Sequence, residues 1–363
     1  MLRCLPREMT SVPATSYRII RRTPDYDRAI FTLFGEVFGR EGAARFEARW
    51  AWQYLENPYN DADDPIHWIA IDEDGTLLGH ISTMPFQMWW GDREVRARSS
   101  LDQFVDPKAR GRGVGIALVK AHIADVDLGL ALGMTPSSYP IFKKFFTDIG
   151  PVPAYLKVLD GTALARRRWG PVAGTIAGPL VGLGLTLLSR RVAPAVGLEV
   201  REVASFTEDY TDLWTRARAS YASVVRRDRR YLRWKYEACP YHRHRVFEAR
   251  MRGTLSGFAV ARTEGEPAFR RGIIADLFAD TTDTAAHDAL IDAVVSAFRR
   301  EGVARVETYC LHQAIGASFR RHGFRAGRTT MNYCIAACRS SPDPLARRFE
   351  HQLVLGDGDL DRA

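Results

Sequence analysis

This 363-residue chain has little lysine and no apolar segment near its start. Only six of its 51 basic residues are lysine, so its formal net charge of +8 rests almost entirely on arginine. Such a bias fits an anionic partner, such as phosphates, nucleic acid or a membrane surface, or a coding preference without function. The first sixteen residues lack the apolar core of a secretion signal, so we expect a reducing, cytoplasmic location.

Metal and nucleotide motifs are also missing. Of the five cysteines, Cys334 and Cys338 lie four residues apart, but no second pair of Cys or His matches them. Structural zinc needs four such ligands, so we expect no metal site. The glycine-rich stretch 105–121 is followed by no Gly-Lys-Ser/Thr and lacks the spacing of a dinucleotide fingerprint. We expect no nucleic-acid partner.

Hydrophobic periodicity in the first half alternates between strands and helices. Strands are predicted at 17–22, 66–72, 77–90, 94–105, 128–133 and 152–159, and helices at 25–38, 43–55, from about 114, and at 137–146. This order predicts an α/β (α+β) fold in which helices flank a mixed central sheet.

The second half repeats this outline. Four segments match in the same order: "WQYLENPY" (52–59) with "WKYEACPY" (234–241), "GTLLG" (75–79) with "GTLSG" (253–257), "DQFVD" (102–106) with "DLFAD" (276–280), and "IFKKFF" (141–146) with "SFRRHGF" (318–324). We therefore predict two copies of one domain, at 15–160 and 198–338, followed by a tail at 339–363.

The predicted linker, residues 161–197, is rich in Gly and Pro and flanked by arginine. Its run 169–189 carries no charge and is long enough to span a bilayer. Its glycines and prolines weaken a helix, and a single span would put the two copies on opposite sides of a membrane. A packed or flexible linker, an anchor lying on the membrane surface and a true span therefore remain as alternatives, in that order.

The segment "VDPKARGRGVGIALV" (105–119) lies where a strand gives way to a helix. Glycine allows backbone N–H groups to approach a ligand closely, and the N–H groups at a helix start are unpaired and partly positive. Together with Arg110 and Arg112, such groups suit the oxygens of a diphosphate. A solvated basic turn is the alternative.

This segment resembles the acetyl-CoA-binding motif of the GNAT N-acetyltransferase superfamily, in which Arg/Gln-x-x-Gly-x-Gly/Ala follows a Val-x-Pro strand end. Val105 and Pro107 match the strand end, and Arg110, Gly113 and Gly115 match the motif. The resemblance implies an acyl-CoA co-substrate, acetyl-CoA by default. It implies cofactor contacts from Phe104, Val105, Arg110, Gly111, Arg112, Gly113, Val114 and Gly115, the first two lying where backbone N–H groups polarise the thioester carbonyl.

A narrower resemblance rests on the "WQYLENPY" block and on "LVLGDGDLD" (353–361). These are similar to segments of two-copy GNAT proteins encoded with bacterial polysaccharide and envelope enzymes. This implies N-acylation of a small-molecule or glycan amine, such as an envelope sugar. An aminoacyl-tRNA-dependent transferase with paired GNAT-like domains is one alternative. A non-catalytic protein that contacts the membrane surface through 169–189 is another.

Two residues are candidates for proton transfer. Asp102 lies on the strand that should face the thioester and could accept the amine proton, although Asp276 matches it in the second copy. Strand alternation would put Asp102 and Phe104 on one face. Many family members protonate the leaving thiolate with a tyrosine, but phenylalanine stands at that position in both copies (Phe142 and Phe319). Tyr139, one helical turn earlier, is the substitute.

The second copy lacks the glycine loop. After "DLFAD" comes "TTDTAAHDALIDAVV", which has no glycine or arginine and carries Asp283, so a diphosphate would meet a carboxylate there. We therefore expect one cofactor site per chain. Trp52, Tyr54, Tyr59 and Trp68 could line an acceptor pocket, but Trp52 and Tyr54 recur in the second copy, which favours packing.

Overall fold

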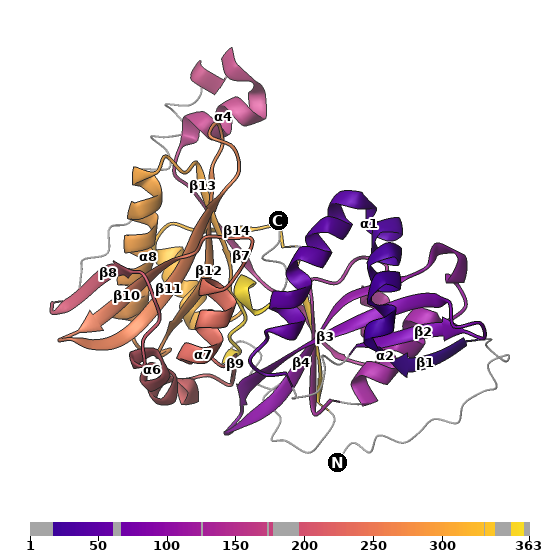
Figure 1. The fold of residues 1–363 in the computed structure, drawn as a ribbon. Helices are drawn as coiled ribbons and strands as arrows, with labels where there is room; N and C mark the ends of the chain where they lie inside the picture. The colour runs from indigo at the N-terminus through magenta and orange to yellow at the C-terminus, as the bar shows by residue number, and fades with distance from the viewer. Residues whose placement is uncertain are drawn as a thin grey trace. The chain divides into compact units, whose positions relative to one another are not determined.

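The computed structural model describes residues 17–60, 67–124, 126–172, 174–176, 196–329, 331–337 and 350–358. The chain forms two units, each described by itself. Unit 1 comprises residues 1–47, 66–83 and 100–125, and unit 2 comprises residues 48–65, 84–99 and 126–363. Strands and helices alternate along the chain (Figure 1), which confirms the predicted α/β class.

Short 3₁₀ or π-helical turns are labelled η. The first half contains β1 (Tyr17–Arg21), η1 (Pro24–Tyr26), α1 (Asp27–Trp50), η2 (Ala51–Leu55), β2 (Trp68–Asp72), β3 (Leu77–Trp90), β4 (Arg93–Val105), η3 (Pro107–Ala109), α2 (Val114–Ala124), β5 (Leu128–Leu132), α3 (Tyr139–Phe142), β6 (Thr147–Pro151), β7 (Ala154–Val158) and α4 (Gly161–Trp169).

The second half contains β8 (Leu198–Val203), α6 (Asp209–Ala217), η4 (Arg218–Ser220), β9 (Ser223–Val225), α7 (Arg229–Leu232), η5 (Arg233–Glu237), β10 (Arg245–Met251), β11 (Thr254–Glu264), β12 (Arg271–Ala279), α8 (Thr284–Arg300), β13 (Arg305–Tyr309), α9 (Gln313–Arg321), β14 (Arg325–Gly327), β15 (Asn332–Ala337) and η7 (Leu355–Asp357).

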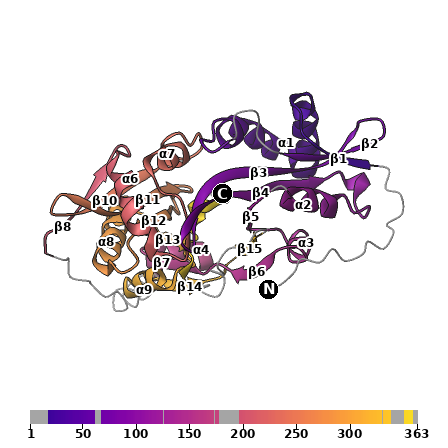
Figure 2. The same cartoon turned by 90° about the horizontal axis from the view of Figure 1, so that it is seen from below.

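The strands form two sheets. One follows the order β1-β2-β3-β4-β5-β15-β6, with β9 paired to β3, and the other follows β14-β7-β13-β12-β11-β10-β8. In unit 1, α2 packs against β1 and β2 (Figure 2). In unit 2, α8 packs along β10, β11 and β12 through apolar residues at helical spacing, from Ala286 to Phe298.

The two sheets exchange a strand. β15 pairs antiparallel with β5 and β6, whereas β7 pairs antiparallel with β13 and β14 (Figure 2). The predicted first copy, 15–160, thus ends in a strand of the second sheet, and the predicted second copy, 198–338, ends in a strand of the first. The boundaries of the sheets therefore do not coincide with the boundaries of the predicted copies. The copies, which were inferred from sequence repetition, stay a prediction.

Three predicted helices differ in extent from the observed ones. The helices predicted at 25–38 and 43–55 form α1, which breaks at Gly39 (φ +80°), and the last residues become the π-helical η2. The helix predicted at 137–146 covers only Tyr139–Phe142, since Pro140 fits only a first turn and the chain must enter β6 at Thr147, a strand that the periodicity did not reveal.

The repeated tryptophans contact each other inside unit 2. Trp52 in η2 and Trp234 in η5 stack with ring centroids 5.3 Å apart, and each indole N–H donates to the other residue's carbonyl oxygen at 2.8 Å. Tyr54 is fully buried. Trp52 and Tyr54 therefore pack in the interior of unit 2, as their repetition suggested.

Only part of the predicted linker and tail falls within the described residues. Residues 161–172 and 174–176 are helical apart from Gly170, and 177–195 lie outside the description. Among the helices that the structure describes, none is both long and apolar enough to cross a membrane. Of the predicted tail, residues 350–358 are described, and their apolar side chains are buried in unit 2.

Candidate functional site

The junction between β4 and α2 contains the predicted cofactor-binding residues, all of them in unit 1. Asp106 ends the strand and accepts a hydrogen bond from the Lys108 N–H at 2.7 Å, which starts the short turn η3. Gly111 and Gly113 then adopt φ values of +81° and +82°. Other residues are strained in this left-handed region, so both glycines are required for the path of the chain.

The start of α2 has the donors that an anion would need. The first helical hydrogen bond runs from Ala117 N–H to Gly113 O, so the N–H groups of Val114, Gly115 and Ile116 have no partner within the helix. Gln103 Nε2 donates to Gly115 O at 2.9 Å and ties this turn to β4. The side chains of Arg110 and Arg112 are exposed beside it.

Gly79 on β3 allows this helix to pack closely on the sheet. A Cβ at this position would lie 3.0 Å from Phe104 O and 3.1 Å from Val114 Cγ1. Its counterpart Gly257 is equally crowded, with Ala279 Cβ at 2.8 Å. The glycine shared by "GTLLG" and "GTLSG" therefore has the same packing role in both halves.

Asp102 lies in a break of β4 rather than in a regular strand. Its φ is +45°, and three consecutive residues before it, Ser99, Ser100 and Leu101, are all buried. The positive φ of Asp102 departs from the regular strand geometry on which the expected alternation of Asp102 and Phe104 rests. Asp102 is half-buried, and Phe104 packs against Phe34 at 5.3 Å between ring centroids. The role of Asp102 as base stays a prediction.

Two histidines that the sequence analysis missed adjoin this break. His80 Nδ1 lies 3.1 Å from the Asp102 carbonyl oxygen, and His80 Nε2 lies 3.0 Å from His67 Nδ1. Both rings are fully buried, and burial lowers the pKa of His80 to about 4 and that of His67 well below its usual range. A single histidine in a predicted strand more often indicates core packing, so the sequence offered no reason to select either one. Only the contact between the two rings in the structure identifies them as a pair.

Tyr139, the predicted acid, belongs to unit 2. Its hydroxyl donates to the Asp148 carboxylate, with both oxygens at 2.8 Å, and Lys143 Nζ lies 5.0 Å from the centre of its ring. Phe142 and Phe319, which stand where family members carry tyrosine, are buried. Tyr139 as the acid therefore stays a prediction, and its hydroxyl already donates a hydrogen bond to the Asp148 carboxylate.

The corresponding junction between β12 and α8 is built differently. Asp283 Oδ1 accepts from Ala286 N–H at 2.9 Å and caps α8, so a carboxylate of the chain itself occupies this helix start. Asp276, the counterpart of Asp102, is buried, accepts a hydrogen bond from Tyr236 Oη at 2.8 Å, and forms an ion pair with Arg227, whose Nε lies 2.7 Å from its carboxylate. Arg227 also pairs with Asp357.

Residues 350–358 fill the space where β12 and β13 separate. These strands pair only from Arg271 to Ile274 on β12. Beyond that point Leu277 O accepts from Gln352 Nε2 at 3.1 Å, and Leu353 O accepts from the Leu311 N–H at 3.2 Å. The gap between the two strands is therefore occupied by the chain itself.

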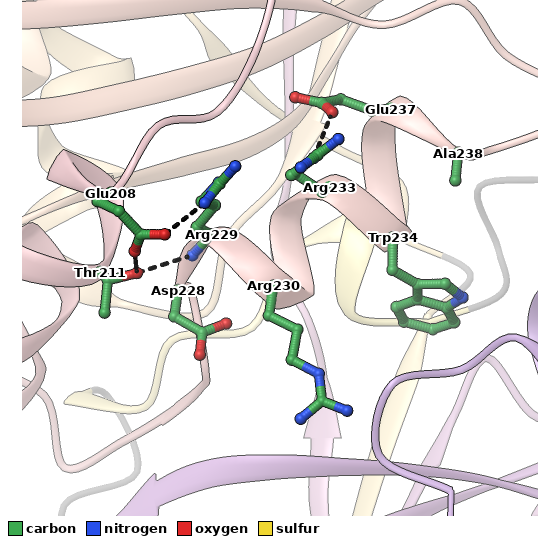
Figure 3. Close-up of a pocket in the computed structure, with 9 residues that line it drawn as sticks. All are labelled: Glu208, Thr211, Asp228, Arg229, Arg230, Arg233, Trp234, Glu237 and Ala238. Carbon is green, nitrogen blue, oxygen red and sulfur yellow. Dashed lines mark hydrogen bonds and ion pairs between the residues drawn. The ribbon is translucent and has the colours of Figure 1, made fainter.

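A cleft of about 820 Å³ lies in unit 2 between α6 and the α7–η5 segment (Figure 3). Its three arginines are already engaged. Arg229 pairs with Glu208 and Arg233 with Glu237, while Arg230 points away from both and donates to Pro58 O. With Asp228 as a third carboxylate, the cleft is charge-balanced. It contains none of the predicted site residues.

Within the described parts of the chain, no group of three or more His, Cys, Asp or Glu side chains could hold a metal ion. The residues that could hold a cofactor are those of the β4–α2 junction. Diphosphate oxygens fit its unpaired N–H groups and its two arginines.

Residues 18–145 match the acetyltransferase (GNAT) domain family. No curated protein matches the sequence. A GCN5-related N-acetyltransferase from Anabaena variabilis superposes with a TM-score of 0.62 at 10% identity, over 88% of this chain and 72% of that one. A probable N-acyltransferase from Enterococcus faecalis gives 0.60 at 15% identity over the same shares.

The N-myristoyltransferase of Saccharomyces cerevisiae, solved with bound myristoyl-CoA, covers more of the chain. Its TM-score is 0.57 at 14% identity, over 94% of this chain and 86% of that one. Residues 18–145 thus match a GNAT acetyltransferase domain, and the two mixed sheets flanked by helices are consistent with tandem GNAT-like domains. The domain match supports acyltransferase activity, and the solved neighbours share the fold.

Proposed function

We propose that this chain, whose residues 18–145 match a GNAT acetyltransferase domain, transfers an acyl group from acyl-CoA to an amine, with acetyl-CoA as the default donor. The observation that carries the proposal is the β4–α2 junction, where three N–H groups lie open beside Arg110 and Arg112 at a turn that only glycine adopts easily. The diphosphate binds there, and the thioester lies along the end of β4.

The acceptor that we propose is an amino group of an envelope sugar or a related metabolite. The narrower sequence resemblance supports this class. The neutral amine attacks the thioester carbonyl carbon, the C–S bond breaks, the amine proton passes to a base such as Asp102, and the thiolate leaves as the thiol after taking up a proton. A thiol has a pKa of about 8.5, so this departure needs little assistance.

Titration calorimetry with acetyl-CoA tests the cofactor assignment. We expect one molecule bound per chain, because the second junction carries the Asp283 cap and a filled gap between its strands. A stoichiometry of two, or no binding, would contradict it. Incubation with acetyl-CoA and a panel of amino sugars, read by thiol release and product mass, tests the acceptor class, and a panel without an acetylated product contradicts that class alone.

We also propose that the two halves are copies of one domain. The π-helical segments η2 and η5 carry the matched tryptophans, which exchange equivalent hydrogen bonds, and Gly79 and Gly257 share one packing role. Reciprocal contacts between matched positions are what two copies related by a local two-fold axis produce. Separate superposition of the two sheets onto one GNAT domain tests this, and it fails if only one of them fits.

A peripheral contact with an anionic membrane surface is a second proposal. At the end of α4, Trp169, Val172 and Ile176 are 56%, 75% and 74% exposed, next to the arginines of its last turn. Exposed aromatic and aliphatic side chains beside basic ones suit a membrane interface. The triple change to serine should abolish flotation with anionic vesicles, whereas Leu55→Ser, at a distant exposed leucine, should not. Equal flotation of the two variants overturns the proposal.

A further inference from the structure

Two consecutive carbonyl groups of β4 accept hydrogen bonds from side chains of β3. Ser82 Oγ donates to Leu101 O at 3.0 Å, and His80 Nδ1 lies 3.1 Å from Asp102 O. In a regular strand, consecutive carbonyls point to opposite edges. Both point toward β3 here because Asp102 adopts φ +45°. The two side chains therefore satisfy the carbonyls that this break displaces.

The proton positions in this cluster follow from the partners. A carbonyl oxygen only accepts, so the proton of neutral His80 lies on Nδ1, and its Nε2 is left as an acceptor. His67 Nδ1, 3.0 Å from that atom, must then carry a proton and donate it. Burial keeps both rings neutral. His67 thus fixes the tautomer in which His80 can hold the Asp102 carbonyl.

The second half offers an internal comparison. Continuing the match of "GTLLG" with "GTLSG" by three residues places Phe258 at the position of His80 and Val260 at the position of Ser82. Both donors are therefore missing there. Among the described non-glycine residues, only Asp102 and Arg252 have positive φ, so Asp276 does not share the conformation of Asp102. The register of β11 and β12 also shifts beside Asp276, so both halves have an irregularity at this place. The donors and the positive φ occur together only in the half that has the glycine loop.

We propose that His80 and Ser82 are positioning residues of the acyl-transfer site, with His67 holding His80. By fixing the carbonyls of Leu101 and Asp102 toward β3, they set the direction of the backbone of residues 103–105, whose N–H groups polarise the thioester carbonyl. This inference rests on the proposed function. His80 and Ser82 need not touch the substrate. They act on it only through the position of the β4 backbone.

The test uses the full-length protein and acetyl-CoA labelled with ¹³C at the thioester carbonyl, observed by isotope-edited infrared spectroscopy. Bound to the wild type, the carbonyl stretch should move to lower frequency than in solution. In His80→Phe, which installs the residue of the second half, most of that shift should be lost, while calorimetry shows less than about a threefold change in affinity. Once an acceptor amine has been identified, the kcat of His80→Phe should be lower than that of the wild type by about tenfold or more, with little change in KM.

Two conservative variants separate positioning from simple packing. The side-chain amide of asparagine can replace Nδ1 of His80, so His80→Asn should keep the carbonyl shift. Glutamine places its amide nearer Nε2, so His80→Gln should lose the shift although it still reaches His67. Ser82→Ala leaves only a small void and should lose part of the carbonyl shift. It provides the test if a His80 variant fails to fold.

The outcomes are distinct. If Asn and Gln behave alike, or Ser82→Ala leaves the band unchanged, the positioning role is overturned while the proposed function stands. If the wild type binds no acetyl-CoA, the proposed function is overturned and this inference with it.

Discussion

The two strand-to-helix junctions of this chain start alike and then diverge. Asp106 and Asp280 both end their strands by accepting from the N–H group two residues later. α2 begins eight residues after Asp106, through two left-handed glycines, whereas α8 begins four residues after Asp280. In α8 the carboxylate that accepts from a helix N–H group belongs to Asp283, whereas for α2 we propose that a ligand supplies it. On this proposal, the two junctions differ in which molecule supplies the anion at the helix start.

The largest effect should come from breaking the charge cluster of the second half. Arg227 is fully buried against Asp276 and Asp357, so Arg227→Met leaves two buried carboxylates without their cation. We expect a loss of about 3–5 kcal/mol in the free energy of unfolding, measured in urea. Arg229→Met, at the more exposed pair with Glu208, should change the free energy of unfolding far less.

The pH dependence of this variant sharpens the test. Burial already raises the pKa of Asp357, and losing Arg227 raises it further. The folded variant then takes up protons more readily than the unfolded chain, so its deficit in stability should shrink as the pH falls from 7 toward 5. If the loss of stability in Arg227→Met did not depend on pH, the variant would not contain a buried carboxylate left without its cation.

The second comparison is between Asp102 and Asp276. Asp102→Asn keeps a side chain that tolerates positive φ but removes the proposed proton acceptor. We expect turnover to fall about 100-fold with acetyl-CoA affinity nearly unchanged, together with loss of the acidic limb of the pH–rate profile. Asp276→Asn should lower stability instead, because it weakens a buried ion pair. An unchanged profile in Asp102→Asn, with reduced stability, would make both residues structural.

The glycine turn itself gives the next effect. Gly113→Val strains a backbone held at φ +82° and displaces the N–H groups at the start of α2. Acetyl-CoA affinity should fall about tenfold or more, since each charge-assisted hydrogen bond contributes roughly 1.5–3 kcal/mol. Gly253→Val carries the same strain at φ +86° in the β10–β11 turn and should leave affinity unchanged. Equal loss in both variants would point to general destabilisation.

The smallest effect concerns the cap of α8. Asp283→Ala removes the acceptor from the Ala286 N–H and should cost about 1 kcal/mol, whereas Asp283→Asn should cost little. Neither should create a second acetyl-CoA site, because residues 350–358 still fill the gap between β12 and β13. Calorimetry that finds two sites in Asp283→Ala would show that the cap alone separates the two junctions.

Local patterns predicted local structure well. β3 spans the predicted residues 77–90, and α2 begins at Val114 because glycines and a buried apolar stripe adjoin there. The same patterns could not predict which strands pair with one another. Nothing in the composition of β7 or β15 shows which sheet each will join, since a buried strand has the same periodicity beside any neighbour. His80 escaped notice for the same reason: its meaning depends on a carbonyl displaced by a conformation of Asp102 that no spacing encodes.

The exchange of β7 and β15 also determines the order in which the chain can be completed. While the ribosome is still making the second half, β5 and β6 have already emerged, but β15, which lies between them, has not. Their edges stay open and prone to pairing with other chains until synthesis is nearly finished. Neither half can be produced alone with a complete sheet, and folding must wait for contacts distant in sequence, which slows it.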